Sequence, residues 1–222
     1  MTNPQVDLLA DGGFSSEPIY IADLDKCLPS NAMGPDPKSR SWRTLSYESD
    51  VITGVMILAG PETAAPDITY HVNVSGWYAV SIGIYGERRN NTRVQVKRSG
   101  DDTFSILTVA PTDQVQGGQI QEVFWKVTDL TDHHLVLGQM SWRVASGDGP
   151  GTCQSAPAGI AYIKLVKLTT RELKAWLVDK KSIESRTLFA HNDAHSVHFL
   201  DRPTTAADIR RHVEVYRNSD IS

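Results

Sequence analysis

A regular alternation of apolar and small or polar positions runs through the segment Trp77–Tyr85. Four large side chains, Tyr78, Val80, Ile82 and Ile84, fall on one face of an extended chain, and mostly smaller residues lie between them. A period of two residues is typical of a β-strand that buries one face. The pattern therefore predicts a half-buried strand over these nine residues.

Similar short segments recur through residues 17–168, separated by clusters of Gly, Pro, Asn and Asp that favour turns. About ten short strands at this spacing predict a mainly β protein, an antiparallel sandwich or barrel. Two longer segments, Pro29–Arg40 and Ala145–Ala158, are predicted to be loops that either bind a ligand or simply connect strands. The other predicted strands are Pro18–Ala22, Trp42–Tyr47, Thr53–Leu58, Ile68–Val74, Arg93–Lys97, Phe104–Val109, Glu122–Val127, Leu135–Trp142 and Ile160–Leu168.

The strand pattern gives way to a helical one at Thr169–Lys180. Leu173, Trp176 and Leu177 recur at helical spacing and predict one apolar stripe that faces the rest of the protein. The segment also begins with the Thr-x-x-Glu spacing of a capping box, in which two side chains satisfy the first free backbone N–H groups. We therefore predict a surface helix here.

The remaining residues suggest the beginning of a different unit. Arg186–Ala190 reads as a strand, His191–Pro203 as a polar loop and Thr205–Asn218 as a second helix. A strand followed by a crossover helix needs a second parallel strand, and none follows in this sequence. The predicted organisation is a sandwich over residues 1–168, a linker helix over 169–185, and the truncated first β-α unit of a following barrel over 186–222.

Composition narrows the classes of partner. The 222 residues carry 22 Lys and Arg against 26 Asp and Glu, a net charge of −4, which argues against non-specific nucleic-acid binding. No apolar run approaches the roughly 18 residues of a membrane-spanning helix. The first residues, MTNPQVDLLADGGFSS, do not resemble a signal peptide. The expected location is either the cytoplasm or, after removal of a leader, outside the cell.

The densest group of chemically active residues lies in the predicted tail. His191, Asp193 and His195 share one face if the strand continues through them, as ligands of a divalent metal or as a base beside an orienting carboxylate would. The end of the first barrel strand is also where barrel enzymes keep their catalytic groups. The alternative interpretation is a hydrophilic loop in which Asp193 bonds to nearby backbone. One strand does not make a complete site, so the chain itself is not predicted to be catalytic.

Aromatic residues near predicted loops are candidates for stacking against sugar rings, while polar neighbours bond to sugar hydroxyls. The candidate ligand-binding residues are Trp42, Tyr85, Glu87, Arg88 and Trp142. The opposing interpretation is that large aromatics inside strands pack in a core.

Three acidic residues near the start of the chain, Glu17, Asp23 and Asp25, are candidate ligands of a structural calcium ion, which prefers carboxylate oxygens. Apart from this calcium ion, no cofactor is predicted.

The order of segments within residues 17–168 resembles a known family. VNVSGWYAV at 72–80 is followed by RVQVKRSGDDTFSIL at 93–107, VFWKVTDLTDHHLVL at 123–137 and GIAYIKLVKL at 159–168. This succession resembles the galactose-binding-domain-like jelly roll of many carbohydrate-binding modules. Residues 186–222 are similar to the opening of the (β/α)-barrel of bacterial glycoside-hydrolase-like proteins, and Ala190–Asp193 is similar to the start of some phosphodiesterase barrels.

These resemblances imply a non-catalytic accessory sandwich that binds a polysaccharide or oligosaccharide at the front of a larger glycoside-hydrolase-like protein. The first alternative is a metal-dependent hydrolase or phosphodiesterase that uses the cluster of His191, Asp193 and His195. The second alternative is a structural or oligomerisation module that self-associates through its C-terminal tail.

Overall fold

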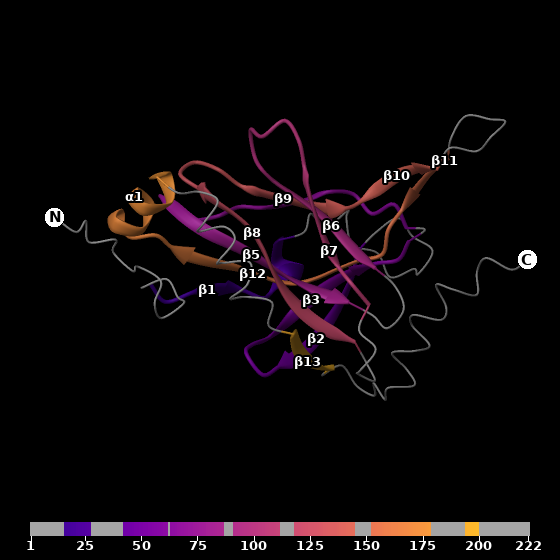
Figure 1. Ribbon diagram of the computed structural model, residues 1–222. Helices are drawn as coiled ribbons and strands as arrows, with labels where there is room; N and C mark the ends of the chain where they lie inside the picture. The colour runs from indigo at the N-terminus through magenta and orange to yellow at the C-terminus, as the bar shows by residue number, and fades with distance from the viewer. Residues whose placement is uncertain are drawn as a thin grey trace, which may run out of the picture.

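The computed structural model describes residues 16–27, 42–61, 63–86, 91–111, 118–144, 152–178 and 194–199. These residues are mainly β, as the alternation predicts, with one α-helix and one short 3-10 helix (Figure 1). The elements are β1 (Ile19–Ile21), η1 (Leu24–Cys27), β2 (Arg43–Ser49), β3 (Thr53–Ala59), β4 (Ile68–Tyr70), β5 (Trp77–Gly86), β6 (Thr92–Arg98), β7 (Ser105–Val109), β8 (Gln119–Asp129), β9 (Leu135–Gln139), β10 (Ser141–Val144), β11 (Thr152–Ser155), β12 (Ala158–Lys167), α1 (Thr170–Val178) and β13 (Ala194–Phe199).

The strands form two antiparallel sheets and a separate ribbon. The larger sheet has seven strands in the order β1-β12-β3-β2-β13-β8-β5, and the smaller has four in the order β4-β9-β6-β7. β10 and β11 pair with each other and extend to one side of the molecule (Figure 1). Because β12 also pairs with β5, the seven-stranded sheet closes on itself.

One apolar core fills the space between the two sheets. Val80, Ile82 and Ile84 of β5 contribute to it from the larger sheet, and Val94 and Leu137 contribute from the smaller one; all five are fully buried. The three side chains of β5 are among those that the alternation in the sequence places on one face. Side chains from the inner faces of both sheets form one core, a kind of packing known from β-sandwiches, so this part of the pattern is confirmed.

The opposite face of β5 is buried as well, which corrects the prediction of a half-buried strand. Every residue of β5 after Trp77 is buried. The ring of Tyr162 lies across Gly83, where an added Cβ would come within 2.4 Å of it. Near the start of the strand, Ala79 packs in a second cluster with Trp176 of α1. Small side chains on this face therefore leave room for covering residues and do not mark a solvent-facing surface.

The helix α1 is capped as its sequence predicts. The backbone N–H of Glu172 donates to the Thr169 hydroxyl at 3.3 Å, and the Thr169 N–H donates to the Glu172 carboxylate at 2.7 Å, a reciprocal capping box. Leu173 and Trp176 pack inward, whereas Leu177 is 54% exposed. The predicted apolar stripe is thus wrong at Leu177.

The structure has thirteen strands among its described residues, where the sequence predicts about ten. The predicted strand Leu135–Trp142 is divided between β9 and β10, and β11 lies within the predicted loop Ala145–Ala158. β13 likewise lies where a loop was predicted, and it pairs with β2 and β8 of the seven-stranded sheet. The predicted strand at 186–190 and helix at 205–218 lie outside the described residues, and the three-part division of the chain stays a prediction.

Candidate functional site

A groove of about 670 Å³ lies beside two edge strands. Its lining comes from β1 and η1, from the start of β3, and from β4 with the residue that follows it. β1 is an edge of the seven-stranded sheet and β4 is an edge of the four-stranded sheet. The polar and aromatic lining residues are Tyr20, Asp23, Lys26, Thr53, Thr69, Tyr70 and His71, and Ile19, Ile21 and Ile52 add apolar surface.

A close crossing of two chain segments holds one side of the groove in place. The Val55 N–H donates to the Ala22 carbonyl at 2.8 Å, and Asp23 forms an isolated parallel bridge with Val55. A Cβ on Gly54 would lie 2.5 Å from the Ala22 carbonyl oxygen, so only glycine permits this approach. The carboxylate of Asp23 pairs with the ammonium of Lys26 at the mouth of the groove.

Aromatic side chains line the groove from both sides. Tyr20 is half-buried, and its ring meets the edge of Tyr162 with centroids 5.4 Å apart. Tyr70 is half-buried against the core between the sheets. His71 is exposed, and its ring lies edge-on to that of His134 with centroids 4.2 Å apart. The groove therefore offers aromatic surface that is partly accessible and held by packing.

A buried ion pair lies beneath Tyr20. The Lys164 ammonium bonds to both carboxylate oxygens of Glu122, at 2.8 and 3.1 Å, and the Tyr162 hydroxyl donates to the same carboxylate at 3.2 Å. The Lys164 and Glu122 side chains are only 11% and 4% exposed. The Lys164 nitrogen also lies 5.6 Å from the centre of the Tyr20 ring. The network thus connects β8 and β12 with Tyr20 of β1 in the wall of the groove.

Electrostatics stabilise one protonation state of this network. Burial alone would lower the pKa of Lys164, but the hydrogen bond and negative charge of Glu122 outweigh it and raise that pKa. Burial, reinforced by the charge of Glu122, raises the pKa of the Tyr162 hydroxyl well above its usual range. Lys164 is therefore charged and Tyr162 is a neutral donor. Because these groups bond to one another, we assign the network a structural role below the groove.

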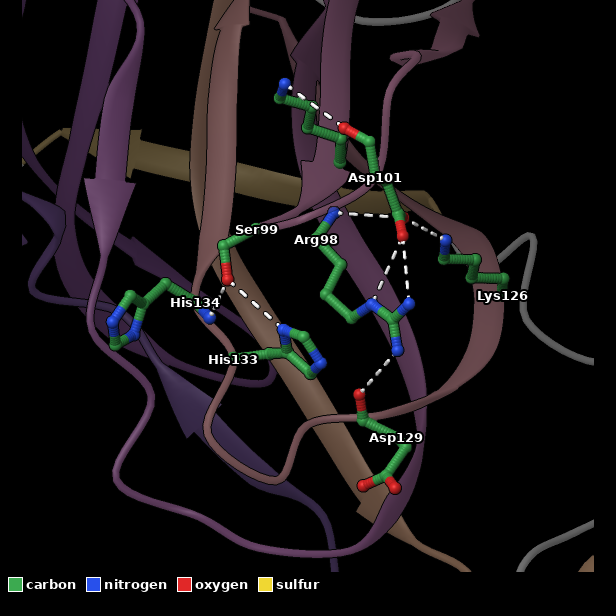
Figure 2. Close-up of polar contacts among 8 residues, drawn as sticks. Arg98, Ser99, Asp101, Lys126, Asp129, His133 and His134 are labelled. Carbon is green, nitrogen blue, oxygen red and sulfur yellow. Dashed lines mark hydrogen bonds and ion pairs between the residues drawn. The ribbon is translucent and has the colours of Figure 1, made fainter.

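A second polar cluster joins the two sheets beside the end of β6 (Figure 2). Asp101 follows β6 and accepts from the Arg98 guanidinium at 3.0 and 3.2 Å and from the Lys126 ammonium at 2.7 Å. Arg98 belongs to the four-stranded sheet and Lys126 to the seven-stranded one, so Asp101 links the sheets. Arg98 also donates to the backbone carbonyl of Asp129 at 3.3 Å.

The residues beside this cluster position His134, the histidine that packs against His71 of the groove. The Ser99 hydroxyl accepts the His134 N–H at 2.9 Å and lies 3.4 Å from Nδ1 of His133 (Figure 2). The Ser99 N–H donates in turn to the His134 carbonyl at 2.8 Å. The turn before β9 is thereby fixed against the end of β6. Its His134 ring supports His71 at the rim of the groove.

Asp129–Thr131 lie within the segment at 123–137 that contributes to the family resemblance, and they form a turn. Asp129 accepts from both the backbone N–H and the hydroxyl of Thr131, at 3.0 and 2.8 Å. These bonds lower the pKa of Asp129. The Thr131 hydroxyl also accepts the Gly76 N–H at 2.9 Å, and Leu130 N–H donates to the Gly76 carbonyl. This motif connects the segment before β5 with the segment after β8.

The predicted sugar-binding aromatics lie away from the groove lining. Trp42 is fully buried and its indole N–H donates to the Pro66 carbonyl at 2.8 Å, while Tyr85 is 3% exposed. Neither ring has a free face for a sugar to stack on, because both belong to core clusters. Glu87 and Arg88 lie outside the described residues. For Trp142 the structure describes the backbone, within β10.

The predicted catalytic group lies mostly beyond what the structure describes. His191 and Asp193 are outside the described residues, and the backbone of His195 is in β13, opposite Ile120 of β8. The predicted position of the three residues on one face of a strand stays a prediction.

The three predicted calcium ligands do not come together. Glu17 and Asp23 are exposed and Asp25 is half-buried. In the part of the chain that the structure describes, no group of three or more His, Cys, Asp or Glu side chains is placed to hold a metal ion. Asp23 instead lines the groove and forms an ion pair with Lys26.

Sequence reasoning misses the aromatic residues of the groove. Tyr20 and Tyr70 lie within predicted strands, where an aromatic side chain signals core packing as readily as binding. The available signal is position, since both belong to very short strands at sheet edges. That position becomes visible only when the strand order is known.

Comparison with known proteins adds no family: no protein-family model matches the sequence, and no curated protein is significantly similar to it. Within the described residues no helix is both long and apolar enough to cross a membrane.

Proposed function

We propose that this chain is a non-catalytic carbohydrate-binding β-sandwich of the galactose-binding-like jelly-roll type, an accessory to a larger sugar-processing protein. The observation that supports this proposal is the groove between β1 and β4. It combines half-buried tyrosines with a rim of hydroxyl, carboxylate and imidazole groups. Ligand sites commonly join such apolar surface to a few polar groups that fix orientation.

The chemistry of the lining suits a neutral sugar. The C–H faces of a pyranose ring pack on the flat rings of Tyr20 and Tyr70, and its hydroxyls find partners in Asp23, Thr53 and Thr69. The acidic and basic groups at the mouth, Asp23 and Lys26, pair with each other. The groove therefore presents no excess of positive charge that would favour an acidic polysaccharide.

Calorimetric titration with a panel of soluble neutral and acidic oligosaccharides tests the proposal. The full chain should bind at least one neutral oligosaccharide, and Tyr70→Leu should weaken that binding about tenfold, which corresponds to about 1.4 kcal/mol of lost aromatic contact. Leucine keeps apolar packing against the core but removes the flat ring face.

Phe104→Leu is the matched control, because Phe104 is a half-buried aromatic outside the groove lining and contacts Lys97. Its affinity should equal that of the unaltered chain. The proposal fails if no oligosaccharide binds, or if the two leucine variants lose affinity equally.

A further inference from the structure

One short strand closes the seven-stranded sheet. β2 pairs with β3 on one side, and β8 pairs with β5 on one side. The remaining edges of β2 and β8 are joined by β13 alone within the described residues. Residues 47–49 of β2 pair with residues 199–197, and residues 119–121 of β8 pair with residues 196–194, all antiparallel. β13 therefore fills a slot between two strand edges, and in Figure 1 it lies beside β2.

Each wall of the slot holds β13 by only three residue pairs. β5 and β8, in contrast, share ten pairs. Unpaired strand edges readily accept an extended segment from another chain, since they present a row of free N–H and C=O groups. When β13 dissociates, the edges of β2 and β8 are exposed together.

We propose that the slot between β2 and β8 is a strand-addition site that accepts residues 194–199 of a second copy of this chain as well as the chain's own. The segment fits both walls in register, so the same six residues from a partner make the same backbone bonds. No new surface has to be formed. Exchange of an identical element is a low-cost route to a dimer.

The length of the connection permits both arrangements. Fifteen residues, 179–193, separate the end of α1 from the start of β13. Fully extended, a chain of that length spans up to about 50 Å. This length is sufficient for β13 to pair with its own sheet or with the sheet of a neighbouring copy. Protein concentration then decides between the two states, because exchange is bimolecular.

Register-specific disulfides test the proposal in the full chain. Two single-cysteine proteins, Gln121→Cys and Ala194→Cys, are made with Cys27 and Cys153 replaced by serine. Residues 121 and 194 are directly opposite in the pairing of β8 and β13, within reach of a disulfide. Because each protein carries one cysteine, a bond between residues 121 and 194 forms only across two copies. Mixing them under mild oxidation should yield a covalent heterodimer that increases with concentration.

Gln119→Cys mixed with Ala194→Cys is the matched control. Residue 119 is also a half-buried glutamine of β8, but it lies opposite residue 196, two positions out of register. This pair should give no heterodimer above the level of random collision, whereas Gln119→Cys with Ser196→Cys should restore it. A double variant carrying both Gln121→Cys and Ala194→Cys reports the intramolecular bond.

Three results would overturn the proposal. If only the double variant forms a bond, within one chain, then the slot accepts its own strand and not that of a partner. If neither the mixed single-cysteine proteins nor the double variant forms a bond, β13 does not occupy the slot. Equal heterodimer yields from the in-register and out-of-register pairs would show contact between tails without strand addition.

Discussion

The seven-stranded sheet has buried residues on both of its faces, but they are buried by different means. The face toward the four-stranded sheet is covered by apolar side chains from strands on both sides. The other face carries the Glu122–Lys164 pair and Tyr162 beside a small cluster with Tyr47 and Met56. Apolar packing tolerates many combinations of similar volume, whereas a buried ion pair requires one arrangement of partners.

The difference between the faces begins in β5. Its branched residues Val80, Ile82 and Ile84 point to the apolar core. Its small residues Ala79, Ser81 and Gly83 leave space on the other side. Gly83 lies between Tyr162 of β12 and Glu122 of β8 in the strand register. The tyrosine ring crosses the glycine and its hydroxyl reaches the carboxylate two strands away. One missing side chain thus permits the polar network.

The largest expected effect comes from breaking the ion pair on one side only. Glu122→Leu should lower the free energy of unfolding by about 3–5 kcal/mol, because Lys164 is left as an uncompensated buried charge. Adding Lys164→Met should recover most of that loss, since the double variant replaces the pair with apolar groups. Urea-induced unfolding of the single and double variants measures both values.

Glu48→Leu is the control for this experiment, because Glu48 is exposed on β2. Its effect should stay within about 0.5 kcal/mol. If Lys164→Met adds its own loss to that of Glu122→Leu with no recovery, the two residues do not act as a pair and the contrast between the faces fails.

The second effect concerns the glycine that the network crosses. Gly83→Ala should lower the free energy of unfolding by about 1–3 kcal/mol, the typical result of overpacking, because the new methyl group would collide with the Tyr162 ring. In a Tyr162→Ala background, the same change should cost much less or become favourable, since alanine normally restricts the unfolded chain more than glycine does. Thermal or urea unfolding of the four proteins gives the coupling.

Ile82→Val provides the comparison on the apolar face at the adjacent position. It should cost about 0.5–1.5 kcal/mol, and this cost should not depend on Tyr162. An equal dependence of both substitutions on Tyr162 would show that the sheet transmits changes between its faces, contrary to the separation described above.

The sequence predicts the features that depend on neighbouring residues. Alternation within β5 identifies its core face because strand geometry sends successive side chains to opposite sides. The capping box of α1 is equally local, as Thr169 and Glu172 are three residues apart. Both predictions are confirmed by the structure.

Features that depend on strand order could not be predicted in the same way. Glu122 and Lys164 are 42 residues apart and meet only because β8 and β12 both flank β5. The groove likewise brings together residues near positions 20, 53 and 70. Trp42 follows a Pro-rich segment that suggests exposure, yet its ring is buried beside Pro66. No local pattern specifies which strand edges become neighbours.

The smallest expected effect concerns Asp101, which links the two sheets. Burial alone would raise the pKa of Asp101, but its bonds to Lys126 and Arg98 outweigh burial and lower it. A carboxylate whose pKa is lower in the folded state stabilises the protein above its unfolded pKa of about 4. That contribution disappears as the pH falls through the folded pKa.

Asp101→Asn should therefore cost about 1–2 kcal/mol at pH 7, between the values for exposed ion pairs and for hydrogen bonds to charged groups. The difference from the unaltered protein should shrink as the pH falls below about 4. Urea unfolding at pH 7 and pH 3 measures it, and Asp102→Asn, at the exposed neighbouring position, should change little at either pH. A pH-independent loss would mean that Asp101 acts by shape and hydrogen bonding alone. Charge would then contribute to stability only on the face of the sheet that carries Glu122.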